Sequence, residues 1–136
     1  MINRTVTAVL DAPKNVVFDY LSKIENLPHW ATEFAQELRY KDGKAKIVNG
    51  LGEFYFSIDA DAETGVIDMY AGPSEGEMGL FPTRVVALGP NRSAYSFTMF
   101  KAPGVPDELF EAQHRSLQRE FENIRARFPA QQTKAG

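Results

Sequence analysis

The chain contains no cysteine, which excludes disulfide bonds, thiolate catalysis and the thiolate ligands of most structural zinc sites. It has no excess of basic residues, and its net charge of −3 argues against nucleic acid as a partner. No segment approaches the roughly 20 apolar residues of a membrane span, and Asp11 interrupts the apolar N-terminus before a signal-peptide core can form. We therefore expect one cytoplasmic domain over residues 1–129, with a disordered tail over residues 130–136.

The strongest local pattern predicts a long helix over residues 107–128. Asp107 suits the N-cap position, and Pro129 ends the run. A helix of this length is roughly 33 Å long, so its apolar stripe needs a wide apolar surface beneath it. The stripe recurs at steps of three and four and consists of Phe110, His114, Leu117, Phe121, Ile124 and Phe128.

The remaining segments are mostly typical of strands joined by turns. Asp42-Gly43 is the clearest turn signal and predicts a two-residue type I′ loop. A short helix is expected over residues 13–22, opened by Pro13, and a second short helical turn carries Trp30 and Phe34. By alternation and β-branched content, strands are predicted over residues 2–10, 36–41, 44–48, 52–60, 66–71, 83–88 and 93–101.

This order of elements predicts an α+β fold. We expect a curved antiparallel sheet of about six to seven strands, wrapped around the long C-terminal helix, with two short helices after the first strand. The glycine-rich stretch over residues 72–79 is interpreted as a loop that bends at the rim of a cavity, if the fold encloses one. Asp68 and Arg84 fall mid-strand, and solvent exposure is favoured for both.

The opening of the chain resembles a known superfamily. Residues 6–30, VTAVLDAPKNVVFDYLSKIENLPHW, are similar to the start of START-like (SRPBCC, Bet v 1-like) proteins, which begin with a strand, an AP-x-x-V-[FW] helix start and a second short helix. The closing helix and the strands between extend the likeness over residues 2–128. The residues that carry the match are Ala12, Pro13, Val16, Val17, Phe18, Leu21 and Trp30.

The resemblance implies a helix-grip fold with a hydrophobic cavity between the sheet and the C-terminal helix. Relatives include polyketide cyclase/dehydrase and lipid-transport proteins, and the superfamily has no shared catalytic motif to carry over. The NTF2-like cone is a rival fold that fits less well, because its helices usually come early in the chain.

Large apolar side chains supply the candidate ligand-binding residues. Side chains of this kind ordinarily pack densely in a core, and only the resemblance favours a pocket. The candidate set is Trp30, Phe34, Phe54, Phe56, Met69, Tyr95, Phe97, Met99, Phe110, His114, Leu117 and Phe121.

His114 is the candidate acid/base, because it occupies a stripe position otherwise held by apolar side chains. The plainer interpretation is a histidine at the edge of the core that finds a hydrogen-bond partner. His29, Glu33 and His114 could form a two-histidine, one-carboxylate metal site, but only His29 and Glu33 have helical spacing. We expect neither a metal nor a cofactor.

Three functions follow from these patterns. The first is binding of a small hydrophobic or aromatic ligand, lipid-like or polyketide-like, between sheet and helix. The second is a polyketide cyclase/dehydrase-type enzyme that uses His114 to move protons. The third is a protein-interaction module whose cavity is closed. The first function makes a small hydrophobic molecule the partner, and a homodimer is left open.

Overall fold

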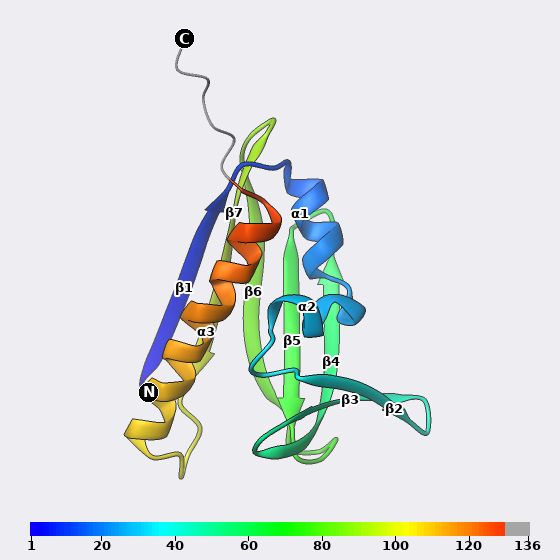
Figure 1. Ribbon diagram of the computed structural model, residues 1–136, viewed down its shortest axis with the longest axis vertical. Coiled ribbons are helices and arrows are strands. Elements are labelled where there is room, and N and C mark those ends of the chain that lie inside the picture. Colours follow the sequence, from blue (N-terminus) through cyan, green and yellow to red (C-terminus); the bar gives the residue numbers. More distant parts are fainter. Residues whose placement is uncertain (130–136) are drawn as a thin grey trace.

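A seven-stranded antiparallel sheet forms the body of the molecule, and helices cover one of its faces (Figure 1). The computed structural model describes residues 1–129; the predicted disorder of residues 130–136 lies outside this range. The strands are β1 (Asn3–Leu10), β2 (Glu37–Lys41), β3 (Lys44–Asn49), β4 (Gly52–Asp61), β5 (Val66–Gly72), β6 (Gly79–Gly89) and β7 (Arg92–Phe100). Their order across the sheet is β1-β7-β6-β5-β4-β3-β2, so the first strand returns beside the last.

The helical segments follow the predicted order. They are α1 (Lys14–Leu21), the 3₁₀ turn η1 (Ile24–Asn26), α2 (Leu27–Trp30) and α3 (Asp107–Arg127). The long C-terminal helix is confirmed, ending one residue earlier than predicted. Pro28 does not break the short second helix but lies in its first turn, where a missing N–H costs no intrahelical bond. Phe34 follows α2 instead of lying within it.

The Asp42-Gly43 turn is as the sequence predicts, whereas strand β6 begins earlier than predicted. Asp42 and Gly43 have φ angles of 53° and 76°, the positive values that a type I′ loop requires. Strand β6 begins at Gly79, four residues before the predicted start, because Pro82 and its neighbours are part of the strand. Pro82 lies opposite Asp68 of β5, and pairing with β7 ends at the next residue, Thr83. Proline has no backbone N–H, so a strand tolerates it at a position where an N–H would have no partner strand to bond.

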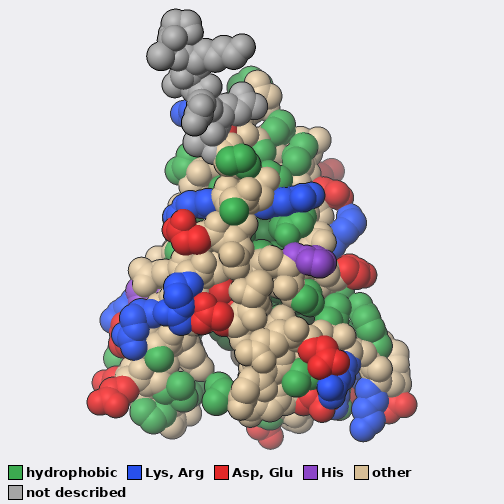
Figure 2. Space-filling view, in the orientation of Figure 1, with side chains coloured by type: hydrophobic (Ala, Val, Ile, Leu, Met, Phe, Trp, Pro, Cys, Tyr) green, Lys and Arg blue, Asp and Glu red, His purple; other side chains and the backbone are tan. Residues whose placement is uncertain are grey.

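The sheet divides at this end. Strands β6 and β7 pair only as far as Thr83 and Phe97, after which β6 continues beside β5 and β7 continues beside β1. Figure 2 shows an opening at this end of the molecule, between the N-terminal half of α3 and the β2–β3 hairpin. The fold therefore provides a route from solvent toward the space under α3.

The buried core lies between the sheet and α3. Phe121 of α3 stacks on Tyr95 of β7, with ring centroids 5.6 Å apart and planes at 19°. At the edges, Arg4 pairs with Glu111 at 2.7 Å and Arg125 donates to the Thr7 carbonyl at 3.3 Å, which ties α3 to β1. On the outer face of the sheet Arg84 is exposed as expected, and Asp68 is half-buried.

Candidate functional site

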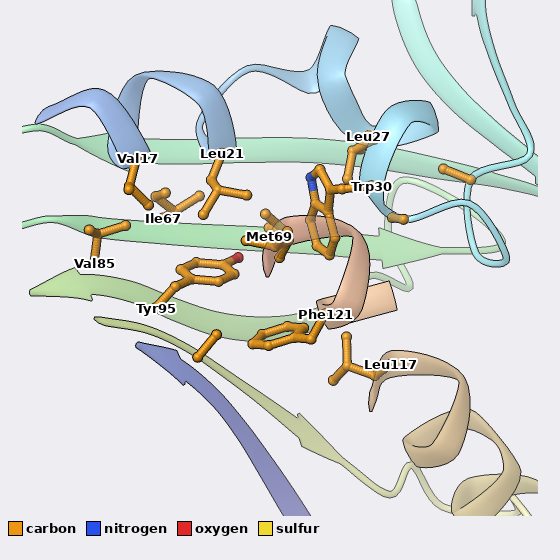
Figure 3. Packing of buried hydrophobic residues seen from close by; sticks show 14 of the residues in the cluster. Val17, Leu21, Leu27, Trp30, Ile67, Met69, Val85, Tyr95, Leu117 and Phe121 are labelled. Carbon is orange, nitrogen blue, oxygen red and sulfur yellow. The ribbon is translucent and has the colours of Figure 1, made fainter. Parts of the chain in front are cut away.

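An apolar cavity lies where α2, α3 and the divided end of the sheet meet. In Figure 3 the side chains of Trp30, Met69 and Leu117 point toward the same space from α2, β5 and α3 respectively. The residues that line the cavity are Leu27, Trp30, Ala31, Phe34, Phe56, Met69, Phe81, Phe97, Met99, Gln113, Leu117 and Glu120. Ten of these twelve side chains are apolar, so desolvation of an apolar ligand is the main interaction the cavity offers.

The size of the cavity limits what it can hold. Its volume is about 80 Å³. A buried cavity that holds benzene has a volume of roughly 150 Å³. A small molecule therefore fits only if its bulk extends toward the mouth or the walls move outward.

The structure brings seven of the twelve sequence-predicted binding residues to the cavity wall: Trp30, Phe34, Phe56, Met69, Phe97, Met99 and Leu117. It places the other five elsewhere. Tyr95, Phe110 and Phe121 pack in the core, and Phe54 is half-buried against it. The loop over residues 72–79, expected at a cavity rim, contributes no lining residue; its Glu75 pairs with Lys44 of β3 at 2.5 Å.

His114 lies away from the cavity. Its side chain is 18% exposed, and Nδ1 lies 3.8 Å from Oε2 of Glu111 on the same helix. It does not line the apolar cavity, so it is not placed to act as an acid or base on a molecule bound there. The histidine lies at the edge of the core, as the plainer interpretation expects, but it has no hydrogen-bond partner within residues 1–129.

Glu120 is the site residue that the sequence did not single out. It lines the cavity and is only 3% exposed. Its Oε2 accepts hydrogen bonds from the backbone N–H groups of Glu33 (3.0 Å) and Phe34 (2.9 Å), whereas Oε1 has no hydrogen-bond partner within residues 1–129. One carboxylate oxygen is thus held by the protein and the other is free.

The surroundings of Glu120 change its acidity. Burial raises its pKa from the ordinary 4.5 to about 7, and the hydrogen bonds from Phe34 and Glu33 only partly oppose this. The Glu33 carboxylate raises the pKa further, and the Arg119 guanidinium lowers it. A carboxyl that exchanges its proton near neutral pH inside an apolar cavity is a group that can bind a donor or move a proton.

The segment that follows α2 is clamped to α3. The Glu33 carboxylate accepts hydrogen bonds from Ser116 Oγ (2.9 Å) and from Arg119 Nε (2.9 Å) and Nη2 (2.6 Å). The Arg119 hydrogen bonds are the main reason that the pKa of Glu33 is lowered. Asn123 Nδ2 donates to the Trp30 carbonyl at 3.0 Å. These bonds fix the wall formed by α2 and the segment after it against the helix.

Two buried polar atoms beside this region have no hydrogen-bond partner within residues 1–129, Trp30 Nε1 and Tyr95 Oη. The Thr83 hydroxyl near Tyr95 opposes the rise in the tyrosine pKa that burial causes, but its proton goes to the Ile67 carbonyl at 2.6 Å. No hydrogen bond of ordinary geometry joins the two hydroxyls. Unsatisfied polar atoms of this kind are uncommon in cores and lower the free energy of unfolding.

The structure does not bring His29, Glu33 and His114 together as a metal site. Glu33 is engaged by Ser116 and Arg119, His114 lies beside Glu111, and no group of three or more histidine or acidic side chains in the described part of the chain is placed to hold a metal ion. Among the helices within residues 1–129, none combines the length and the apolar character needed to cross a membrane.

Comparison with known proteins gives likenesses of fold. No family model and no curated protein matches the sequence. Among solved structures, the protein XoxI from Bacillus cereus is similar over 94% of this chain and 96% of its own, with a TM-score of 0.73 and 13% identity. A START superfamily protein from Mycobacterium smegmatis is similar over 93% and 96%, with a TM-score of 0.65 and 16% identity.

A third similar structure is the ZhuI aromatase/cyclase from a Streptomyces species, with 90% of this chain and 88% of that one covered, a TM-score of 0.63 and 16% identity. These likenesses show a shared fold: the chain has the helix-grip α+β fold, as its opening motif led us to expect.

Proposed function

We propose that the protein binds a small hydrophobic or aromatic molecule in the cavity between α2, α3 and the divided end of the sheet. The observation that carries the proposal is the cavity itself, which is walled by apolar side chains from α2, α3 and strands β4 to β7 and has the exposed Gln113 among its lining residues. Burial of apolar ligand surface would supply most of the affinity, at roughly 25 cal/mol per Å² of apolar area removed from water. That the chain acts in the cytoplasm remains a prediction from the sequence, which leaves a homodimer open.

A second candidate is an enzyme that moves protons on a carbonyl-rich substrate. The raised pKa of Glu120 favours it, because a carboxyl with a pKa of about 7 exchanges protons at physiological pH. The likeness in fold to an aromatase/cyclase is consistent with it. In this version Glu120, rather than His114, would be the acid/base. The finer identity of the molecule expected from the sequence, lipid-like or polyketide-like, remains a prediction in both versions.

The proposal can be tested by native mass spectrometry of freshly purified protein, followed by solvent extraction of any bound molecule. Ala31→Leu adds three carbons where Ala31 lines the cavity and is 2% exposed, so this variant should carry less than a tenth of the wild-type ligand. Ala62→Leu makes the same change at an exposed turn residue and should carry the wild-type amount. Equal loading of the two variants would contradict binding in this cavity.

A further inference from the structure

We propose that the cavity selects molecules that join an apolar body, about the size of one aromatic ring, to a single protonated amine, with Glu120 Oε1 as the oxygen that binds the amine. This inference rests on the proposed binding function and names the ligand class for the same cavity.

The first argument is the unequal state of the two Glu120 oxygens. The two backbone N–H groups of Glu33 and Phe34 converge on Oε2 at 3.0 and 2.9 Å, so this oxygen is already used in holding the segment after α2. Oε1 belongs to the same 3% exposed side chain on the cavity wall and has no hydrogen-bond partner among the described residues. A carboxylate oxygen that has no partner in the protein can accept a hydrogen bond from a donor that a ligand brings.

The second argument is charge. No lysine, arginine or histidine within residues 1–129 forms an ion pair with Glu120. Arg119 is next to it in the chain, but its guanidinium is engaged by both oxygens of Glu33. Of the groups that act on Glu120, Glu33 comes from the facing segment and Arg119 from its own helix, and the sheet contributes only apolar side chains to the cavity.

These two arguments rank ligand classes. A protonated amine supplies both the donor and the missing positive charge, so it stabilises the ionised carboxylate inside the apolar cavity. A hydroxyl supplies the donor alone. A carboxylate ligand, such as an ionised fatty acid, places like charges together and is disfavoured. The cavity therefore discriminates by charge among molecules with the same apolar body.

The test uses three probes with a common ring: benzylamine, ethylbenzene, which has a methyl group in place of the ammonium, and phenylacetate. Dissociation constants are measured by calorimetry at pH 6 and pH 8. Benzylamine should bind at least about tenfold more tightly than ethylbenzene at pH 8, and phenylacetate should bind most weakly. Benzylamine stays protonated at both pH values, so its affinity should fall about tenfold at pH 6, where Glu120 is mostly protonated.

Two variants locate the effect. In Glu120→Gln the ratio of benzylamine to ethylbenzene affinity should fall close to one. In Glu122→Gln, which removes a charge from the exposed side of α3, the ratio should stay as in the wild type. If ethylbenzene does not bind to the wild type at all, the proposed ligand-binding function itself is overturned. If ethylbenzene binds but benzylamine is not preferred, or the preference survives Glu120→Gln, only the inference about the amine is overturned.

Discussion

Phe34 and Glu120 are 86 positions apart in the chain, yet the backbone N–H of Phe34 donates to Glu120 Oε2 at 2.9 Å. This bond joins the segment after α2 to the middle of α3. Both residues also line the cavity, so the carboxyl that fixes one wall belongs to the cavity lining, and its Oε1 has no hydrogen-bond partner within residues 1–129. The charge of Glu120 therefore acts on the stability of the fold and on the chemistry of the cavity at once.

Glu120 should make stability depend on pH. Its pKa is about 7 in the folded protein against an ordinary 4.5, so between these pH values the folded state holds a proton that the unfolded chain has released. The free energy of unfolding should therefore fall as pH rises from 4.5 to 7, with up to about 3 kcal/mol of the fall due to this carboxyl. Glu120→Gln should lack this contribution, as measured by urea unfolding at pH 4.5, 6 and 8. Glu122→Gln should retain it, and identical pH profiles for the two variants would contradict the assignment.

Tyr95→Phe should leave the free energy of unfolding unchanged or raise it by up to about 1 kcal/mol. The reason is that the buried hydroxyl has no hydrogen-bond partner within residues 1–129, so its removal ends a desolvation cost without breaking a bond. Thr83→Val is the comparison, because it breaks the 2.6 Å bond to the Ile67 carbonyl and should lower the free energy of unfolding by about 1–2 kcal/mol. Denaturant unfolding of both variants measures the effects. A loss of more than about 1 kcal/mol in Tyr95→Phe would show that the hydroxyl is satisfied in solution.

Gly65 lies in the turn before β5, and Gly104 serves as its control, because alanine substitutions at the two positions separate the cost of close packing from the cost of backbone strain. Both have positive φ, 79° and 84°, but a Cβ at Gly65 would lie 2.0 Å from the Val85 carbonyl oxygen, whereas at Gly104 it would meet nothing within 4 Å. Gly104→Ala should cost only the conformational strain of about 1 kcal/mol. Gly65→Ala should cost at least about 2 kcal/mol more, because the backbone of β6 must move. Thermal and urea unfolding compare the two, and equal losses would refute the close approach.

His114→Ala should leave the affinity for an apolar ligand within about twofold of the wild type, because His114 does not line the cavity. Ala31→Leu, which fills the cavity, should reduce the same affinity at least about tenfold. Calorimetric titration with ethylbenzene measures both. A large loss of ethylbenzene affinity in a folded His114→Ala variant would show that this histidine belongs to the binding site.

Much of the fold could be predicted from the sequence because the determining signals are local. The stripe from Phe110 to Ile124 predicts α3, and the Asp42-Gly43 pair predicts a turn that requires two positive φ angles. The start of β6 could not be placed, because Pro82 argues against a strand unless one knows that the β6–β7 pairing has ended beside it.

The key site residue could not be chosen from the sequence, for a geometric reason. At 3.6 residues per turn, His114 and Glu120 lie about 60° to either side of Leu117, three residues before it and three after. Periodicity places both at the margins of the apolar stripe and does not say which margin faces the cavity. A glutamate in that position is ordinarily assigned to solvent. The signal available was that Glu120 directly precedes the buried Phe121 and lies four residues before the buried Ile124.

The most direct test of the account is a titration with ethylbenzene followed through the four methionine methyl groups by NMR. Met69 and Met99 line the cavity, whereas the exposed Met1 and Met78 of the loop before β6 do not. The account predicts saturable ring-current shifts at Met69 and Met99, no shifts at Met1 and Met78, and loss of the shifts in Ala31→Leu. Unchanged Met69 and Met99 signals at ethylbenzene saturation would contradict it, because they would mean that the cavity does not admit even one aromatic ring.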